Sequence, residues 1–241
     1  MKIDKSLKNK VFFVIPAYNE ERSIGKVIDL LISNNYENLI IINDGSYDFT
    51  SKIVADKIQK IQNNNIVLLE HVINRGQGAS LKTGIDFARS IESCKYIVTF
   101  DSDGQHRISD LPKFLKALEN DECDIAIGSR FLNKETKQLV PLKKRILLKG
   151  ALLITLFLSN INLTDTHNGY RVIKKSIANE LNITLDGFEH ASEILDDISK
   201  KGIRYKEIPV FIDYTNYSQA KGQKMSNSVK ILLKMLFKSN K

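Results

Sequence analysis

The stretch YIVTFDSDGQH, residues 96–106, joins a short apolar run to two carboxylates that stand two positions apart. An apolar, β-branched run of this length that is bounded by polar and glycine residues predicts a buried strand. The strand would then end by placing Asp101 and Asp103 in an open crevice. Carboxylates spaced in this way can share a hard divalent cation, which in turn neutralises a diphosphate. A solvated turn with an aspartate cap would have the same sequence. The residues that follow the other predicted strands are therefore needed to distinguish a cation site from such a turn.

Short apolar runs alternate with stretches of helical length through the first half of the chain. The predicted strands cover residues 11–15, 39–42, 66–69, 96–100 and 125–127, with a later strand-like run at 205–211. The predicted helices cover residues 21–33, 49–61, 79–91 and 111–118. Alternation at this spacing predicts an α/β fold in which helices flank one mostly parallel sheet. Ligands of such sheets bind beyond the carboxyl ends of the strands.

Polar, acidic and glycine residues follow each of the five earlier strands. Besides 101–106, these clusters are PAYNEE at 16–21, NDGS at 43–46, HVINRGQG at 71–78 and GSR at 128–130. Each has a structural alternative, since helix caps, tight turns and first-turn acids use the same residue types. Five such clusters at one edge of a sheet indicate a ligand site instead. Neither a GxxxxGK[ST] loop nor a GxGxxG after the first strand is present, which disfavours those two modes of nucleotide binding.

Length and composition favour one domain that spans residues 1–241. The chain is 42% apolar and 27% charged, which is ordinary for an α/β protein. No apolar run reaches the roughly 18 residues that a membrane span needs, and the N-terminus lacks the apolar core of a signal peptide. These features predict a cytoplasmic location. Cys94 and Cys123 fit no metal or disulfide pattern.

The net charge of +8 is concentrated in two segments. Residues 134–149 carry +5 and residues 221–241 carry +6, so the rest of the chain is acidic. In the second segment apolar residues fall at helical spacing beside a stripe of lysines, which predicts a basic amphipathic helix suited to an anionic membrane surface. A solvated basic tail is the alternative. Neither segment has a nucleic-acid-binding pattern.

The ordered motifs resemble family 2 glycosyltransferases of the GT-A fold, and within them the polyprenyl-phosphate branch that includes dolichyl-phosphate-mannose synthase-like enzymes. The matching segments are VIPAYNEE at 14–21, INDGSYDFT at 42–50, NRGQGASLKTG at 74–84, FDSDGQH at 100–106, IGSRF at 127–131 and DTHNGYRV at 165–172. The resemblance implies a single Rossmann-like sheet. It also implies a nucleotide-sugar half at 11–130, an acceptor half at 131–220 and the basic C-terminal segment at 221–241.

The resemblance also implies roles for individual residues. The nucleotide would contact Pro16, Ala17, Tyr18, Glu20, Asp44, Gly78, Asp101 and Ser102, with Asp44 reading the base or the ribose. Mg²⁺ or Mn²⁺ would be held by Asp103 and Gln105, whose oxygens are hard ligands. Arg130 would meet the diphosphate, and Arg171 and Lys224 would meet the diphosphate or the acceptor. Asp103 and Arg130 are the predicted catalytic residues.

The implied reaction is a metal-dependent, inverting transfer of a sugar from a UDP- or GDP-sugar to a polyprenyl phosphate at the cytoplasmic membrane face. A phosphate acceptor needs no general base, and the chain has no Glu-Asp pair to supply one. One alternative is transfer to a hydroxyl of a surface glycan or a lipid-linked oligosaccharide, with Glu189 or Glu193 as base. Another is a non-catalytic partner subunit that binds a nucleotide sugar. Any membrane contact would be peripheral or through a partner, and nucleic acid is not expected as a ligand.

Overall fold

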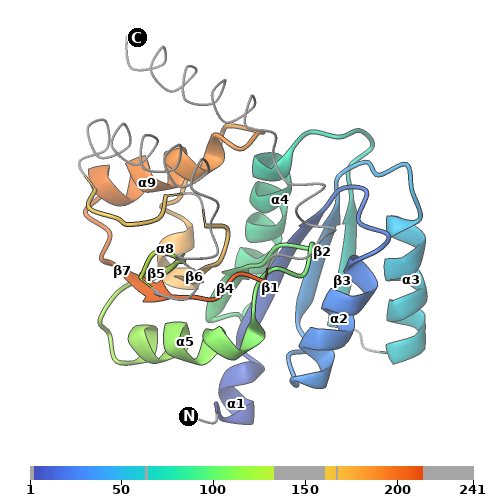
Figure 1. Ribbon diagram of the computed structural model, residues 1–241, viewed down its shortest axis with the longest axis horizontal. Helices are drawn as coiled ribbons and strands as arrows, with labels where there is room; N and C mark the ends of the chain where they lie inside the picture. The colour runs from blue at the N-terminus through green and yellow to red at the C-terminus, as the bar shows by residue number, and fades with distance from the viewer. Residues whose placement is uncertain (1–2, 63–64, 133–160, 167, 214–241) are drawn as a thin grey trace.

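The computed structural model describes residues 3–62, 65–132, 161–166 and 168–213 (Figure 1). In these residues seven strands form one sheet in the order β3-β2-β1-β4-β6-β5-β7. The strands are β1 (Val11–Ala17), β2 (Leu39–Asn43), β3 (Ile66–Glu70), β4 (Tyr96–Thr99), β5 (Ile125–Ser129), β6 (Arg171–Lys174) and β7 (Tyr205–Pro209).

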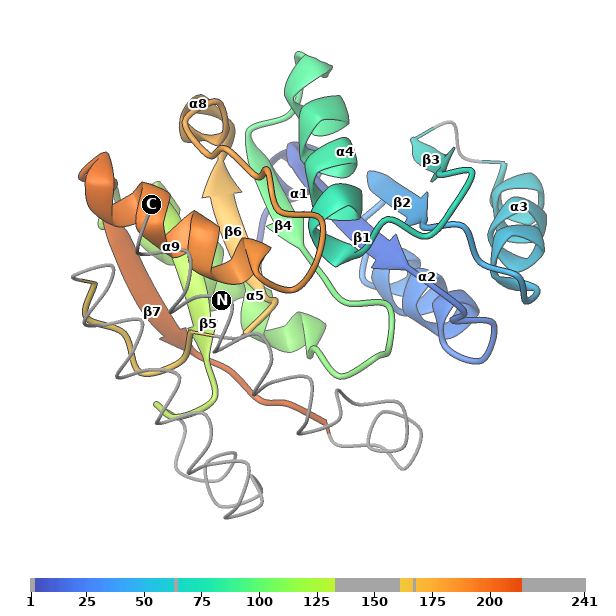
Figure 2. The same ribbon diagram turned by 90° about the horizontal axis from the view of Figure 1, so that it is seen from above.

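Helices connect most of these strands and cover both sides of the sheet (Figures 1 and 2). They are α1 (Lys5–Lys8), α2 (Ile24–Ser33), α3 (Thr50–Ile61), α4 (Gln77–Ser90), the 3₁₀ turn η1 (Ile108–Asp110), α5 (Leu111–Glu119), α8 (Lys175–Ala178) and α9 (His190–Lys200).

The sheet is parallel except at β6. Strands β1, β2, β3 and β4 pair in parallel, as do β5 and β7, whereas β6 lies antiparallel between β4 and β5. The predicted α/β fold with a mostly parallel sheet is therefore confirmed. Strand β6 was not predicted, because its first two residues end the segment at 165–172 that we interpreted only as a site motif. An antiparallel strand begins where its neighbours end, so Arg171 pairs with Thr99 and Ile127 near the ends of β4 and β5.

Two apolar cores lie on the two faces of the sheet. Phe13 and Ile15 of β1 pack in one core with α2, α3 and α5, and Phe12 and Val14 pack in the other with α4, α8 and α9. Every residue of β1 is buried. A central strand that is covered on both faces needs apolar side chains on both, which explains its continuous apolar sequence.

Helix α4 lies unusually close to the sheet. A Cβ atom at Gly84 would stand 2.4 Å from Val14 Cγ1 and 2.6 Å from Ile42 Cδ1. Only glycine allows this approach. The middle of α4 is thereby held against β1 and β2.

Most predicted element bounds agree with the structure to within a few residues. The predicted helix at 21–33 begins later, at Ile24, because the N–H groups of Ser23 and Ile24 both donate to the Glu20 carbonyl and form a turn. Helix α9 was not predicted. The basic segments at 134–149 and 221–241, the second of which includes Lys224, lie outside the described residues. The division of the chain into two functional halves stays a prediction.

Candidate active site

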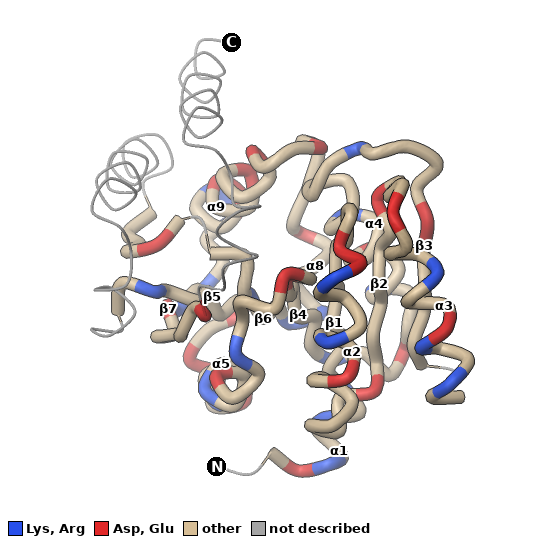
Figure 3. The backbone as a smooth tube through the Cα atoms, turned by 45° about the vertical axis from the view of Figure 1, so that its right-hand side comes forward, with Lys and Arg blue, Asp and Glu red and all other residues tan. Residues whose placement is uncertain are grey.

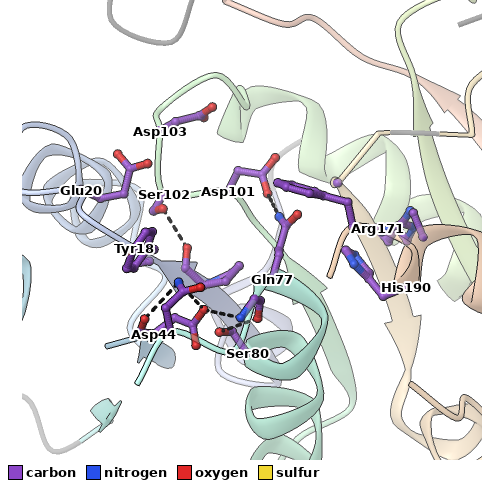
Figure 4. A pocket seen from close by; sticks show the side chains of 17 residues that line it. Tyr18, Glu20, Asp44, Gln77, Ser80, Asp101, Ser102, Asp103, Arg171 and His190 are labelled. Carbon is purple, nitrogen blue, oxygen red and sulfur yellow. Dashed lines mark hydrogen bonds between the residues drawn. The ribbon is translucent and has the colours of Figure 1, made fainter. Parts of the chain in front are cut away.

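The carboxyl ends of β1, β2 and β4 open into a cavity of about 550 Å³, a size typical of small-ligand sites (Figure 4). Most of its walls come from the loops after these strands and from the starts of α4, β6 and α9. Its lining residues are Pro16, Ala17, Tyr18, Glu20, Asp44, Asn74, Gly76, Gln77, Ser80, Asp101, Ser102, Asp103, Gly169, Arg171, Phe188, His190 and Ala191. Nine of the predicted site residues are among them.

Acidic side chains gather at this edge of the molecule. In Figure 3, acidic positions lie in the loops that follow β1 and β4, and Figure 4 shows Glu20, Asp101 and Asp103 around one part of the cavity. Such a concentration of negative charge favours a bound cation.

Asp101 is held by hydrogen bonds to both carboxylate oxygens. Gln77 Nε2 donates to Oδ1 at 3.1 Å, and His106 Nε2 lies 2.9 Å from Oδ2. Burial raises the pKa of Asp101, but the nearby His106 and Arg171 more than offset that effect, so its pKa is lowered. Asp101 is therefore a charged, fixed carboxylate.

Asp103 has different surroundings. Burial, together with the charges of Asp101 and Glu20, raises its pKa to about 6. The Gln105 N–H donates to Asp103 Oδ1 at 2.9 Å, and the Gln105 carbonyl accepts from the Asp213 N–H at 3.0 Å. An excess of negative charge that raises the pKa of a carboxylate is relieved by a divalent cation, so the residues present fit one here.

The metal would need more ligands than these side chains provide. Among the described residues there is no group of three or more His, Cys, Asp or Glu side chains that could hold a metal ion by itself. A diphosphate can complete such a coordination shell, as it does in Mg²⁺ sites that use one or two carboxylates. The predicted role of the Gln105 side chain stays a prediction, because Gln105 does not line the cavity.

Asp44 organises the loop between β3 and α4. Its oxygens accept hydrogen bonds from the Arg75 N–H at 3.0 Å, the Gly76 N–H at 2.7 Å and Asn74 Nδ2 at 3.0 Å, and His71 Nδ1 lies 2.7 Å away. These partners fill most of the acceptor capacity of a carboxylate. Asp44 is thus in the cavity wall, and its predicted reading of a base or ribose remains untested.

Ser102 links two strand ends. Its hydroxyl donates to the Pro16 carbonyl at 2.7 Å, so the first and fourth strands are tied together at the floor of the cavity. The neighbouring Tyr18 is 37% exposed and makes an edge-to-face contact with Tyr47. A ring placed in this way can stack on a planar base.

Arg171 brings positive charge to the opposite wall. It is 1% exposed, and its Nε and Nη1 atoms have no hydrogen-bond partner among the described residues. Burial lowers its pKa to about 10, although Asp101 and Asp165 favour the charged form, so the guanidinium is charged at neutral pH. Buried N–H groups of a cation are costly to leave unpaired, and an anionic ligand that reached them would supply the missing partners.

Besides Gln105, three predicted site residues are not among the lining residues of the cavity. Arg130 forms a two-pronged ion pair with Asp165, with Nε to Oδ2 at 2.6 Å and Nη2 to Oδ1 at 3.1 Å, and is outside the cavity lining. Gly78 also lies outside the lining, and its N–H donates to the Asp186 carbonyl at 2.8 Å. Lys224 lies outside the described residues.

The two glutamates considered as general bases are also outside the lining. Glu193 accepts hydrogen bonds from the N–H groups of Thr184 and Leu185, at 2.8 and 3.0 Å, and from the Thr184 hydroxyl. It therefore holds the loop before α9. Glu189 precedes that helix as its N-cap residue.

The sequence interpretation missed Gln77, Ser80, Phe188 and His190 as cavity residues. Gln77 and Ser80 lie on the first turn of α4, where a glycine-rich segment signalled a turn but gave no direction for these side chains. Phe188 and His190 come from a region nearly ninety positions after Asp101. Only tertiary packing brings them to the site.

Comparison with known proteins agrees with this geometry. The family model described as "Glycosyl transferase family 2" matches residues 12–181. A protein of Methanococcus voltae named UDP-N-acetylglucosamine–dolichyl-phosphate N-acetylglucosaminyltransferase is 34% identical, over 94% of each chain. An uncharacterized protein of Methanocaldococcus jannaschii is also 34% identical, over 97% of this chain and 94% of its own.

A solved structure supports the fold. Glucosyl-3-phosphoglycerate synthase from Mycobacterium tuberculosis, in complex with Mn²⁺, UDP and glucosyl-3-phosphoglycerate, superposes with a TM-score of 0.64. The match has 16% identity and covers 96% of this chain and 81% of that one. The expected GT-A fold and the resemblance seen in the motifs are both confirmed, and the chain belongs to glycosyl transferase family 2 and is a glycosyltransferase.

Proposed function

We propose that this protein transfers a sugar from a UDP-sugar to the phosphate group of a polyprenyl phosphate, such as dolichyl phosphate, with the help of Mg²⁺ or Mn²⁺. The reaction would take place at the cytoplasmic face of a membrane. The choice of UDP and of dolichyl phosphate is supported by the name of the Methanococcus voltae relative, which shares 34% identity over most of both chains.

The buried guanidinium of Arg171 is the observation that carries this proposal. Arg171 lines the cavity within electrostatic reach of Asp101, and Asp103 lies on the other side (Figure 4). A nucleotide sugar and an acceptor phosphate together bring several negative charges into one site. Carboxylates can bind such anions only through a cation, whereas a guanidinium binds them directly. The two walls suit these two modes of binding.

A divalent cation would be held by Asp103, with Gln105 close by in the same loop. When bound, it stabilises the negative charge that develops on the departing diphosphate. Asp101 would stay ionised beside it, because Gln77 and His106 hold its two oxygens. The base and ribose would lie against Pro16, Ala17 and Tyr18.

The acceptor chemistry follows from the charge of a phosphate. An oxygen of the acceptor phosphate forms a bond to the anomeric carbon while the bond from that carbon to the diphosphate breaks. UDP leaves with the electron pair, and the anomeric centre inverts. A phosphate oxygen is already ionised at neutral pH, so no general base is needed. Arg171 would orient this phosphate or the diphosphate.

A donor and acceptor screen tests the proposal. UDP- and GDP-sugars are mixed with short polyprenyl phosphates and Mn²⁺, and the released nucleoside diphosphate is measured. We expect UDP release that requires both the polyprenyl phosphate and the cation. Equal release with a glycan or oligosaccharide hydroxyl acceptor would contradict the phosphate assignment. No release with any pair would favour a non-catalytic partner subunit.

Two substitutions separate the acceptor classes. Glu189→Gln and Glu193→Gln should both keep most of the activity with a polyprenyl phosphate, because neither glutamate lines the cavity. Loss of turnover in one of them, with nucleotide binding intact, would instead indicate a base and a hydroxyl acceptor.

A further inference from the structure

His190 is a buried side chain of the cavity that the proposed reaction does not use. It is the first residue of α9, is 4% exposed, and lines the cavity on the same side as Arg171 (Figure 4). Its Nδ1 atom lies 2.8 Å from the Gly187 carbonyl oxygen. A carbonyl oxygen only accepts hydrogen bonds, so the ring carries its proton on Nδ1.

The ring is neutral at physiological pH. Burial lowers the pKa of His190 to about 4, and the charge of Arg171 acts in the same direction. The N-terminus of α9, an 11-residue helix, disfavours a positive charge as well. A neutral ring with its proton on Nδ1 has a lone pair on Nε2. His190 therefore offers the cavity a hydrogen-bond acceptor.

Two other uses of this lone pair are disfavoured. A base with a pKa near 4 takes up a proton poorly at neutral pH, so His190 is unsuited to activate a hydroxyl. A metal ion at Nε2 would lie close to the guanidinium of Arg171, which repels it. The remaining partners are neutral donors, namely hydroxyl and amide N–H groups.

The position of His190 in the cavity indicates which of these hydrogen-bond donors it meets. Tyr18 and Glu20 lie on one side of the cavity with Asp103, whereas Arg171 and His190 lie on the other (Figure 4). A nucleotide sugar with its base at Tyr18 and its diphosphate at Asp103 would extend its sugar toward this second side. Sugars are rich in hydroxyl groups.

We propose that Nε2 of His190 accepts a hydrogen bond from a hydroxyl group of the donor sugar and so takes part in selecting that sugar. This role rests on the proposed function, because it assumes a nucleotide-sugar donor. It makes His190 a specificity residue that contacts the substrate and does not take part in proton transfer.

The segment that carries His190 is built to hold its place. The N–H groups of Gly78 and Ala79, at the start of α4, both donate to the Asp186 carbonyl, at 2.8 and 3.2 Å. A Cβ atom at Gly78 would stand 2.0 Å from the Leu185 carbonyl oxygen and 3.0 Å from the Cβ of His190. Gly78 thus serves this packing, and the acceptor is fixed before the sugar arrives.

Binding measurements on two variants test the role. His190→Phe keeps a ring of similar size without an acceptor, and His190→Gln offers an amide oxygen in its place. Titration calorimetry with Mn²⁺ compares UDP, UDP-glucose, UDP-N-acetylglucosamine and the monodeoxy analogues of the sugar nucleotide that the wild-type protein binds more tightly.

We expect His190→Phe to bind UDP as the wild-type protein does and to bind the sugar nucleotide about 3- to 10-fold more weakly, since one neutral hydrogen bond is lost. One monodeoxy analogue should show the same loss with the wild-type protein and no further loss with the variant. His190→Gln should recover part of the affinity.

A matched control variant and two possible outcomes test whether His190 contacts the sugar. Glu193→Gln weakens the support of the same loop from outside the cavity and should leave the ratio of UDP to sugar-nucleotide affinity unchanged. Unchanged sugar-nucleotide affinity in both His190 variants would overturn the proposal. An equal loss for UDP and the sugar nucleotide would overturn it too, because it indicates a structural role. If the wild-type protein binds and transfers no sugar, the proposed function itself fails.

Discussion

Asp101 and Asp103 stand two positions apart and have different hydrogen-bond partners and opposite shifts in pKa. Asp101 has a lowered pKa and accepts from Gln77 and His106. Asp103 has a pKa raised to about 6 by burial and by neighbouring carboxylates. The first is stable as an anion in the free protein, whereas the second gains most from a cation. The sequence pattern shows two acids of the same type, and only their surroundings in the fold give them different pKa values.

Replacing Asp103 should therefore remove activity without harming the fold. We expect Asp103→Asn to lower kcat by about 100-fold or more, because a metal contributes several kcal/mol to stabilising the leaving group. UDP release with Mn²⁺ measures the effect, and thermal unfolding checks the fold. The exposed Asp86→Asn on α4 is the control and should keep full activity. A full rate for Asp103→Asn would reject the metal assignment.

Arg130 requires a different experiment, because its guanidinium is paired with Asp165 in the buried interior. Removing one partner of a buried pair leaves an uncompensated charge and costs about 3–5 kcal/mol. We expect Arg130→Ala and Asp165→Ala each to lower the free energy of unfolding by that order. The double variant should lose less than the sum of the two. Denaturant unfolding measures the cycle, and simple additivity would contradict a structural pair.

His190 predicts a pH dependence of stability. Its pKa is about 4 in the folded state, below the ordinary value of 6.5, so the unfolded state binds more protons between these values. The part of the folding stability that depends on a neutral His190 is complete above pH 6.5 and is lost as the pH falls to about 4. The difference is on the order of 3 kcal/mol. Arg171, Asp101 and Glu193 are the charged groups that face it.

The measurement compares the wild-type protein with His190→Phe. Denaturant unfolding at several pH values from 7.5 downward should show a smaller loss of stability in the variant. Parallel curves for the two proteins would show that His190 is not the group responsible.

At the scale of elements, the position of α4 depends on one missing side chain. Gly84→Ala would push a methyl group against Val14 and Ile42 of the sheet. We expect a loss of about 1–3 kcal/mol in the free energy of unfolding, as overpacked cores show. The shift of α4 should also weaken UDP binding, because Gln77 and Ser80 move with it.

Gly25→Ala on α2 is the matched control. Its added Cβ would stand 3.3 Å from a side-chain methyl of Ile53, so Ile53 would have to move only slightly. Alanine also favours a helix more than glycine does. We expect little change in stability or in UDP binding, measured in the same way. An equal loss in both variants would contradict the role assigned to the Gly84 contact.

For the whole molecule, the cavity predicts a coupling between cation, nucleotide and stability. UDP with Mn²⁺ at about 100 times the dissociation constant should stabilise the folded state by about 2.7 kcal/mol, which raises Tm by several degrees. UDP alone should do much less, because Asp103 and Glu20 repel it. Thermal scans with each component separately and together measure the coupling. An equal shift without Mn²⁺ would contradict it.

The strand ends were the most predictable part of this molecule. A buried strand has a short apolar sequence, and the polar residues that follow it mark the edge of the sheet where ligands bind. Pro16, Asp44, Asp101 and Asp103 were therefore found from the sequence. Directions of side chains were not predictable. Arg130 turns to Asp165, and Gly78 serves the packing of the segment before α9. His190 reaches the cavity only through tertiary contacts, which no local sequence pattern predicts.

No helix in the described part of the chain is long and apolar enough to cross a bilayer. The two basic segments singled out in the sequence, 134–149 and 221–241, lie beyond the described residues. Peripheral membrane contact through them stays a prediction.

The late strand β6 has a consequence for how the chain matures on the ribosome. Strands β4 and β5 are complete by residue 129, yet they meet only through β6, which begins at Arg171. A nascent chain that ends between these points leaves the edges of β4 and β5 that face β6 uncovered, and such edges recruit other chains. Pairing across this separation is also slow. Synthesis that pauses before β6 has left the ribosome should therefore favour aggregation. Once residue 174 has emerged, β6 can cover these two edges, and the other edge of β5 stays open until β7 follows.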